Sequence, residues 1–214
     1  MKWYDKIANL YDFFTAWMYK KARITLIENL ELKKGDRVLI IACGTGQSFQ
    51  LIEKKIGTKG EIIAIDYSIG MLKIAKKRIK KNNWKNIKLI NLDVRDLSQE
   101  YLLSNGIKPD FNIIIGELAF TVIPDWKNVM KTANSLLKKD GKIGLLDWYR
   151  KKNDWLTKIV DFLAKAETSR KTIKFAENIF EDFKIVNKFI FNNVYVGIGK
   201  KKQKNESTTI DKWC

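Results

Sequence analysis

Nine residues, Val38–Gly46 (VLIIACGTG), decide the fold class of this chain of 214 residues. Four consecutive apolar residues run into a glycine-rich turn, and the next segment carries Phe49, Leu51 and Ile52 at helical spacing. Glycine lets such a turn adopt a left-handed backbone and bring amide groups close to a ligand at a helix start. The stretch therefore predicts a buried strand, a tight turn and a helix, the first unit of an α/β sheet.

The same alternation of strand and helix continues outward from this unit. Helices are expected over the first thirty residues, after Ser68, at 129–137 and at 152–166. The expected strands are Arg37–Ala42, Glu61–Ile65, Ile87–Asn91, Asp110–Ile115, Lys142–Asp147, Phe183–Ile190 and Val194–Ile198. Nearly continuous apolar strands between amphipathic helices are typical of a parallel sheet covered on both faces. The sequence thus predicts a doubly wound α/β fold with a mostly parallel, seven-stranded sheet.

Composition limits the classes of function. Lys and Arg total 41 against 24 Asp and Glu, so the net charge is +17. This excess favours phosphate-bearing partners or an anionic membrane surface, although lysine is also an ordinary surface residue. The chain has no histidine, and its two cysteines, Cys43 and Cys214, lie far apart. Any chemistry must therefore work without imidazole, and we expect neither a disulfide framework nor a metal site.

The apolar residues at the N-terminus are interrupted by charges, and no run of about 18 apolar residues occurs. We therefore expect a cytoplasmic protein, soluble or peripheral at the inner face of the membrane.

Each of the first four strands ends in a group suited to a nucleoside. Ligands of open α/β sheets bind outside the carboxyl ends of the strands. Asp66 lies twenty residues after Gly46, the spacing at which a carboxylate accepts hydrogen bonds from a ribose diol. Asp93 ends the next strand, where it can receive the amine of an adenine, and Gly116-Glu117 ends the fourth. Each group alone is more often a turn or a helix cap, but the ordered set predicts a nucleoside pocket.

A dinucleotide site is disfavoured because Phe49 stands where the third glycine of Gly-x-Gly-x-x-Gly is needed. Instead, Val38–Gly46 resembles the first motif of class I S-adenosylmethionine-dependent methyltransferases. Ile65–Leu72 (IDYSIGML) resembles their second motif, Leu92–Val94 their third, and Leu136–Gly141 the loop before their fifth strand. The resemblance spans Tyr4 to Tyr149. It implies a Rossmann-like fold and S-adenosyl-L-methionine as cofactor, with S-adenosyl-L-homocysteine as product.

The resemblance also implies which residues hold this cofactor. Asp66 would bind the ribose and Met71 would pack on the adenine. The full set of implied cofactor contacts is Ala42, Cys43, Gly44, Thr45, Gly46, Gln47, Asp66, Tyr67, Met71, Asp93, Val94 and Gly116. One departure stands out, because the family usually places an acidic residue where this chain has Ile40. That departure leaves the methionine end of the predicted pocket undetermined.

The segment Tyr4–Asp12 (YDKIANLYD) fits the pattern Tyr-Asp-x-x-Ala-x-x-Tyr-Asp. It resembles the lid of quinone-biosynthesis C-methyltransferases and of short bacterial phosphatidylethanolamine N-methyltransferases. In that group the lid closes over the cofactor and its tyrosines face the methyl group. Tyr4 and Tyr11 lie seven residues apart on one helical face, so both can point into one cleft, or both can anchor the helix in the core. We take them as candidate catalytic residues.

These assignments divide the chain into parts. We expect a single methyltransferase domain over residues 1–199, with a helical lid at 1–32 and a cofactor-binding core at 33–149. Residues 150–199 then supply a helix on the substrate side and the two closing strands. Residues 200–214 are polar and basic and are expected to form a disordered tail.

The resemblance to the phosphatidylethanolamine N-methyltransferases accounts for more of the sequence than the resemblance to the quinone-biosynthesis enzymes does. N-methylation of an amine headgroup such as that of phosphatidylethanolamine is therefore our first expectation for the reaction. Two aromatic amphipathic helices, Trp3–Met18 and Trp155–Leu163, are suited to a bilayer interface, although such stripes more often pack on a sheet. Their basic neighbours, which would attract anionic headgroups, are Lys20, Lys21, Arg23, Lys151, Lys152 and Lys158.

Deprotonation of the amine would then fall to Glu117, Tyr4 or Tyr11, with Asp147 as a further carboxylate. Trp148 and Tyr149 are candidates for a cation–π box around the amine.

Three alternatives remain open at this stage. The acceptor can be a soluble small molecule or a quinone precursor, which would use the same cofactor residues. A nucleic-acid substrate fits less well, because Gly116–Ala119 replaces the Asn/Asp-Pro-Pro-Tyr/Phe tetrapeptide of base amino-methyltransferases. An inactive cofactor-binding subunit is favoured only by Ile40. The sequence fixes neither the acceptor atom, the number of methyl groups transferred nor the oligomeric state.

Overall fold

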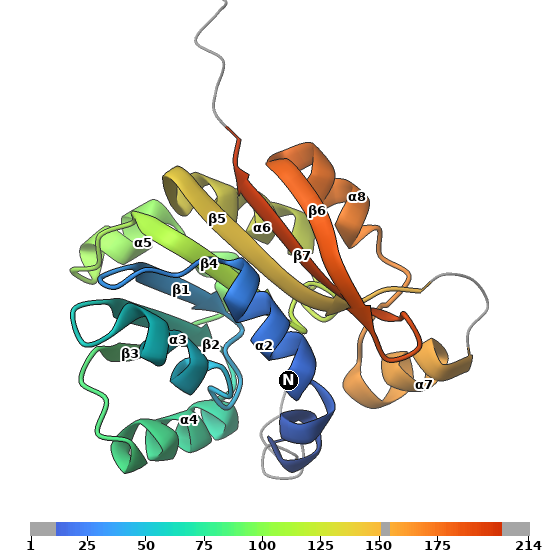
Figure 1. The fold of residues 1–214 in the computed structure, drawn as a ribbon, viewed down its shortest axis with the longest axis horizontal. Coiled ribbons are helices and arrows are strands. Elements are labelled where there is room, and N and C mark those ends of the chain that lie inside the picture. Colours follow the sequence, from blue (N-terminus) through green and yellow to red (C-terminus); the bar gives the residue numbers. More distant parts are fainter. Residues whose placement is uncertain (1–11, 151–154, 203–214) are drawn as a thin grey trace, which may run out of the picture.

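A seven-stranded sheet organises the chain in the computed structural model, which describes residues 12–150 and 155–202 (Figure 1). The strands are β1 (Arg37–Ile41), β2 (Glu61–Asp66), β3 (Ile87–Asn91), β4 (Phe111–Glu117), β5 (Leu137–Trp148), β6 (Phe180–Phe189) and β7 (Val194–Lys201). Their order is β3-β2-β1-β4-β5-β7-β6, with β1 to β5 parallel and β7 antiparallel to both β5 and β6. This arrangement confirms the predicted doubly wound, mostly parallel sheet.

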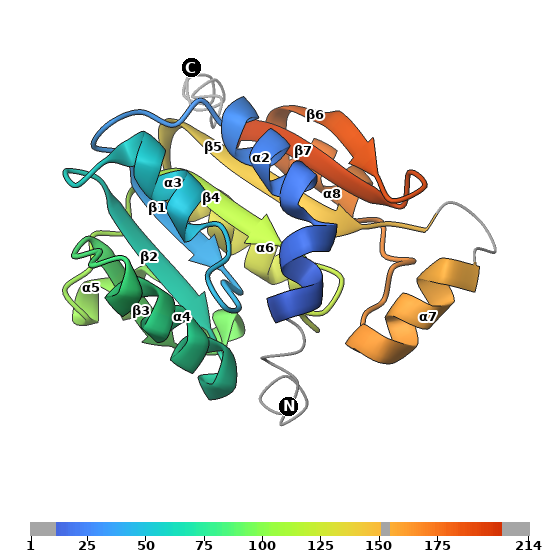
Figure 2. The ribbon, with the colours of Figure 1, turned by 60° about the horizontal axis from the view of Figure 1, so that its bottom comes forward.

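Helices cover both faces of the sheet (Figure 2). They are α2 (Lys20–Asn29), α3 (Phe49–Ile56), α4 (Ile69–Lys81), the short 3-10 helix η1 (Val94–Asp96), α5 (Gln99–Ser104), α6 (Trp126–Leu136), α7 (Trp155–Ala164) and α8 (Thr172–Ile179). The described parts of the chain contain no helix long and apolar enough to cross a membrane.

The central strand β1 divides the apolar residues between the two faces. Val38 and Ile40 join the cluster that contains α2 and α3, whereas Leu39 and Ile41 join the cluster that contains α6. All four side chains are buried, and full burial of such a side chain stabilises the fold by about 1.5–3 kcal/mol. Because both faces are covered, the strand is apolar throughout and needs no polar alternation.

Helix α2 is part of the core, which corrects the prediction of a lid over residues 1–32. Leu26 and Leu30 are fully buried and lie over Gly144 of β5. A Cβ atom at position 144 would come within 2.8 Å of Leu26, so this glycine permits the close approach of α2 to the sheet. The lid motif at 4–12 falls, apart from Asp12, outside the described residues.

Several boundaries near the C-terminus differ from the prediction. Strand β7 extends to Lys201, where Lys200 pairs with Lys142 and Lys201 pairs with Phe180, so the expected disordered tail does not begin at residue 200. Residues 203–214 of that tail lie outside the described residues. Helix α8 was not predicted from the sequence, because its eight residues form little more than two turns and the periodic pattern is too short to recognise.

Asp147 near the end of β5 is fully buried and holds the loop that follows β4. Its carboxylate accepts hydrogen bonds from the backbone N–H groups of Phe120 (2.7 Å), Thr121 (3.2 Å) and Trp148 (2.8 Å), and from the Thr121 hydroxyl (2.7 Å). The expectation that Asp147 handles a substrate proton is therefore wrong. Burial raises the pKa of this carboxyl group to about 6.

Replacing this group tests its role through the pH dependence of stability. An Asp with a pKa of about 6 when folded and about 3.9 when unfolded binds more protons in the folded state between these values. The unfolding free energy of the wild type should therefore fall, by on the order of 2 kcal/mol from this group, as pH rises from about 4 to about 6. Asp147→Asn cannot titrate.

We expect the stability difference between the wild type and Asp147→Asn, measured by urea denaturation, to be larger at pH 4.5 than at pH 7. An equal difference at the two pH values would show that the carboxyl group titrates alike in both states.

Candidate functional site

Three adjoining pockets follow the carboxyl ends of β1, β2 and β4. The nucleoside pocket, of about 210 Å³, is lined by Ala42, Ile65, Asp66, Tyr67, Leu92, Asp93, Val94, Arg95, Val122, Ile123, Pro124 and Lys165. The junction pocket, of about 50 Å³, shares Asp66 and Tyr67 with it and adds Met71, Glu117 and Leu118. The loop pocket, of about 40 Å³, is lined by Arg23, Ile40, residues 42–49, Glu117 and Leu118. Ala42 borders all three, which together form one groove.

The turn after β1 shapes the middle of this groove. Ala42, Gly44 and Gly46 all have positive φ angles, at 52°, 54° and 74°. A Cβ atom on Gly46 would lie 2.3 Å from the Phe49 ring, so this position needs glycine for packing. A Cβ atom on Gly44 would meet nothing within 4 Å, because it would project into open space. The left-handed backbone at Gly44 thus favours glycine, and the open space at its Cβ position leaves room beside the groove for the close approach of a ligand.

Asp66 joins the nucleoside and junction pockets. Its carboxylate accepts hydrogen bonds from the backbone N–H groups of Gly44 (2.7 Å) and Ser68 (2.9 Å). Ser68 in turn caps α4 by accepting a hydrogen bond from the Met71 N–H group. The carboxylate is therefore fixed by the glycine turn and by the start of α4. Each of its oxygens can accept more than one hydrogen bond, so the same group can also receive a ribose diol.

Asp93 lies at the far wall of the nucleoside pocket. It caps η1 and receives the Arg95 guanidinium, with a shortest contact of 2.6 Å. Hydrogen bonds from Arg95 hold the pKa of Asp93 below its ordinary value, so the group is ionised at neutral pH. An adenine amine at this position would share the carboxylate with Arg95. Val94 follows in the same wall of the pocket.

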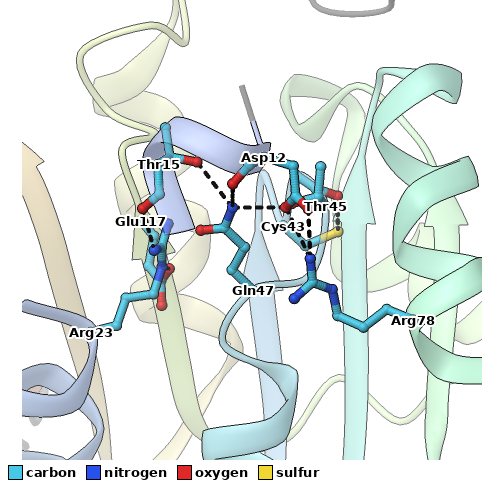
Figure 3. A network of polar contacts seen from close by, with 9 residues as sticks. Asp12, Thr15, Arg23, Cys43, Thr45, Gln47, Arg78 and Glu117 are labelled. Carbon is cyan, nitrogen blue, oxygen red and sulfur yellow. Dashed lines mark hydrogen bonds and ion pairs between the residues drawn. The ribbon is translucent and has the colours of Figure 1, made fainter. Parts of the chain in front are cut away.

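Figure 3 shows a polar network over the glycine turn, centred on Asp12. The Asp12 carboxylate accepts two hydrogen bonds of 2.9 Å from Arg78 of α4, one from the Thr45 hydroxyl and one of 2.7 Å from the Gln47 amide. The Gln47 amide nitrogen also reaches the Thr15 hydroxyl at 3.0 Å. Two predicted cofactor residues, Thr45 and Gln47, therefore tie the N-terminal segment to the turn.

The Gln47 amide oxygen is buried and has no hydrogen-bond partner among the described residues. A buried acceptor without a partner destabilises a protein by about 1–3 kcal/mol, and a donor on a bound ligand removes this penalty. Gln47 lines the loop pocket, so a hydrogen-bond donor on a ligand bound there is a candidate partner for this oxygen.

A buried ion pair closes the loop pocket. The Arg23 guanidinium of α2 lies 3.0 Å from the Glu117 carboxylate, which also accepts a hydrogen bond from the Ser48 hydroxyl. Arg23 further donates to the Thr15 carbonyl at 2.9 Å. Its side chain is 7% exposed, so the prediction that Arg23 flanks a membrane-facing helix is wrong. The two carboxylate oxygens of Glu117 are thus each engaged within the protein, one by Arg23 and the other by Ser48.

The remaining predicted residues separate into three groups. Cys43 lines the loop pocket, where burial raises the pKa of its thiol well above the ordinary value, so it is a neutral thiol. Gly116 lies within β4 against the Phe120 ring and is not among the residues that line the groove. Tyr4 and Tyr11 lie outside the described residues.

The predicted cation–π box is not formed. Trp148 is buried, and its indole N–H donates to the Tyr19 hydroxyl at 2.8 Å. The Tyr149 ring packs edge-on against Tyr195, and the ammonium of Lys188 lies over it. Neither side chain lines the groove. Both are therefore structural in the described part of the chain.

Sequence reasoning missed five polar residues of the site: Asp12, Thr15, Arg23, Ser48 and Arg78. Asp12 had a signal as the last residue of the Tyr-Asp-x-x-Ala-x-x-Tyr-Asp motif, although no role was assigned to it. Arg23 had another, because it stands on the same helical face as the buried residues Tyr19, Leu26, Ile27 and Leu30. A cation on the apolar face of a helix needs a buried partner. The other three look like ordinary surface residues or caps.

The Rossmann-like sheet, with a groove at its carboxyl edge, has the class I methyltransferase fold. Residues 32–208 match the model of a family described as a methyltransferase domain. The chain belongs to this methyltransferase family.

Curated relatives that match this chain are also methyltransferases. The chain is 29% identical over 138 residues to a demethylmenaquinone methyltransferase of Staphylococcus carnosus, covering 64% of this chain and 52% of the relative. It is 30% identical over 145 residues to that of Lactobacillus johnsonii, covering 67% and 55%. The match thus spans about half the length of these relatives.

Solved structures agree in fold. An S-adenosylmethionine-dependent methyltransferase from Aquifex aeolicus superposes with a TM-score of 0.62 at 15% identity, covering 84% of this chain and 89% of that one. The phosphoethanolamine N-methyltransferase 2 of Haemonchus contortus, solved with S-adenosyl-L-methionine, gives a TM-score of 0.72 at 13% identity, covering 95% and 58%. The family match confirms the predicted methyltransferase family, and the solved structures confirm the predicted fold.

The glycine turn yields a matched pair of variants. Gly44 and Gly106 both have positive φ angles, 54° and 68°, and a Cβ atom at either would meet nothing within 4 Å. Gly44→Ala and Gly106→Ala should therefore each lower stability by about 1–2 kcal/mol through backbone strain alone. Only Gly44→Ala should weaken S-adenosylmethionine binding, by at least about tenfold, because its methyl group enters the groove.

Calorimetric titration of both variants with S-adenosylmethionine measures this difference. Equal affinities in the two variants would contradict a close approach of the cofactor to Gly44.

Proposed function

We propose that the protein transfers a methyl group from S-adenosylmethionine to a ring carbon of an aromatic quinone precursor. The proposal rests above all on the groove at the carboxyl edge, which offers a nucleoside pocket at one end and a polar loop pocket at the other. S-adenosylmethionine supplies an electrophilic methyl group on a sulfonium. The protein contributes by aligning the acceptor and excluding water.

The residues of the groove suit the three parts of the cofactor. Asp66 would hold the ribose, and Asp93 with Val94 would hold the adenine between Leu92 and Ile123. At the other end, the Glu117 carboxylate and the Gln47 amide oxygen would receive the ammonium group, and Arg23 would face the carboxylate.

Glu117 can supply the negative charge that is missing at position 40, where the family usually has an acidic residue and this chain has Ile40. In the register of β1 and β4, Ile40 lies beside Ile115, so Glu117 follows two residues later at the strand end. Glu117 therefore brings a negative charge to the same pocket from the neighbouring strand. We propose that it binds the cofactor rather than the acceptor proton.

The walls near the expected methyl group favour a ring over an amine headgroup. Leu118 and Val122 line the junction pocket, between the two ends of the groove. Recognition of a cationic amine would need a free carboxylate or an aromatic box. Within the described residues, the Glu117 carboxylate lines the loop pocket, where it is assigned to the cofactor, and Trp148 is in the core. N-methylation of a lipid amine, the first expectation from the sequence, is therefore the weaker candidate.

The named relatives support the same choice, because the two quoted above are demethylmenaquinone methyltransferases. The likeness to a phosphoethanolamine N-methyltransferase reflects the fold alone. Carbon methylation forms a bond between the ring carbon and the methyl group as the carbon–sulfur bond breaks, and the ring then loses a proton. Tyr4 and Tyr11 stay the predicted lid contacts of the acceptor, and Asp12, next to Tyr11, is held at the glycine turn. A cytoplasmic location stays a prediction.

Methyl transfer from tritiated S-adenosylmethionine tests the proposed reaction. We expect label in a reduced demethylated naphthoquinone, and none above background in phosphatidylethanolamine vesicles or total RNA. The product should carry the methyl group on carbon, which mass spectrometry of the ring fragment identifies. Label in the phospholipid headgroup and none in the naphthoquinone would overturn the proposal in favour of N-methylation.

Two variants test the assignments at the two ends of the groove independently. Glu117→Gln should weaken S-adenosylmethionine binding by about tenfold or more, because a hydrogen bond to a charged group contributes about 1.5–3 kcal/mol. It should leave adenosine binding unchanged, since adenosine lacks the methionine moiety. Asp66→Asn should weaken both ligands, because both contain the ribose. Competition calorimetry gives the four affinities, and a loss of adenosine binding in Glu117→Gln would refute the assigned position.

A further inference from the structure

Helix α7 turns an apolar face to solvent. Trp155, Ile159, Phe162 and Leu163 follow the spacing i, i+4, i+7, i+8 on one side of the helix, and all are exposed. The other side supplies Leu156 and Val160, which pack against the core cluster beneath. The stripe that the sequence identified is therefore real, but it does not pack on the sheet. An exposed stripe of this size marks an interaction surface.

A second apolar surface lies on the helical segment 12–18. Phe13, Phe14, Trp17 and Met18 are exposed, and Trp17 reaches 85% exposure. The same segment turns Asp12 and Thr15 inward to Gln47 and Arg23. It is thus fixed by polar contacts on one side while its aromatic side chains point away from them.

Both surfaces border the groove. Lys165, directly after α7, lines the nucleoside pocket, and Asp12 is bonded to the glycine turn. Figures 1 and 2 both place α7 and the start of the N-terminal helix at the end of the molecule where the parallel strands finish. A partner that covers these stripes would therefore lie over the entrance of the site.

The charges beside the stripes are basic. Lys20 and Lys21 follow the first stripe, and Lys158 and Lys165 accompany the second, all four exposed. The Lys165 ammonium lies 5.4 Å from the centre of the Phe162 ring. The described acidic residues on or beside these segments, Asp12, Asp161 and Glu167, are each paired with an arginine, which is Arg78, Arg150 and Arg170 in turn. Aromatic stripes with flanking lysines are the composition of helices that lie in an anionic bilayer interface.

We propose that the surface formed by residues 12–18 and α7 docks on an anionic lipid bilayer and places the groove at the membrane surface. A second copy of the chain is a less suitable partner, because each copy carries a net charge of +17. The inference rests on the proposed function for its purpose: a ring acceptor with a long apolar tail resides in the bilayer, and its ring can enter the groove while its tail stays in lipid. The docking itself needs neither cofactor nor acceptor.

Vesicle flotation of the full chain tests the docking. We expect the protein to float with vesicles of phosphatidylglycerol and phosphatidylcholine, to float less at high salt, and to stay at the bottom with phosphatidylcholine alone. The double variant Phe162→Ser/Leu163→Ser should bind the anionic vesicles at least about tenfold more weakly.

A matched control is available on the far side of the molecule. Leu103 of α5 is 57% exposed and Leu163 is 56% exposed, so Leu103→Ser removes an equally exposed leucine outside the surface. It should bind vesicles like the wild type. Unchanged S-adenosylmethionine affinity in all variants would show that they are folded.

Two results would overturn the proposal: no flotation of the folded wild type, or equal losses in Leu103→Ser and the double variant. A concentration-dependent dimer in sedimentation, lost in the double variant and without vesicle binding, would overturn it in favour of self-association. A short-chain, water-soluble naphthohydroquinone separates this test from that of function. Its methylation should be equal in the wild type and the double variant, and its absence in both would refute the proposed reaction while leaving the docking result intact.

Discussion

The hydrogen bonds of the Asp66 carboxylate are the constraint on which the site depends. They join the glycine turn after β1 to the start of α4, at 2.7 Å to Gly44 and 2.9 Å to Ser68. The Asn91 amide adds β3 by donating to the Asp66 carbonyl at 3.1 Å. Hydrogen bonds to charged groups contribute about 1.5–3 kcal/mol each, which is enough to hold a turn with three left-handed residues in place. The same carboxylate that orders the turn is thus also presented to the groove.

The ion pair between Arg23 and Glu117 differs from the Asp66 hydrogen bonds in what it contributes. A buried ion pair contributes little net stability, because desolvation of both charges offsets their attraction, but loss of one partner is costly. Stability alone therefore does not account for its position beside Ile40. The pair brings both signs of charge to the loop pocket. In the proposed function these charges would receive the zwitterionic methionine moiety, with Glu117 on β4 in place of an acidic residue on β1.

Local pattern explains which parts of this molecule could be predicted. The strand Ile87–Asn91 agrees with its expected bounds and Arg37–Ile41 and Glu61–Asp66 differ by one residue, because each is a short apolar run closed by a turn signal. The strand-end residues Gly44, Asp66 and Asp93 reach the groove because parallel strands finish at one edge. Arg23 and Asp12 could not be placed, since their partners lie 94 and 66 residues away in the sequence.

Periodicity alone could not decide the environment of the two aromatic stripes. Spacing identifies which residues share a helical face, but it does not say whether that face meets a sheet or solvent. Helix α7 carries both buried and exposed apolar residues, so the pattern allowed packing, the more frequent outcome, as well as exposure. Leu156 and Val160 of this helix pack against the core, whereas the larger aromatic side chains remain exposed. Exposing tryptophan and phenylalanine to water is unfavourable, and the segment 12–18 repeats this cost at the same edge of the groove. Two such surfaces beside one entrance have a common physical explanation if the acceptor itself is amphiphilic, because the apolar phase that holds its tail also covers the exposed rings.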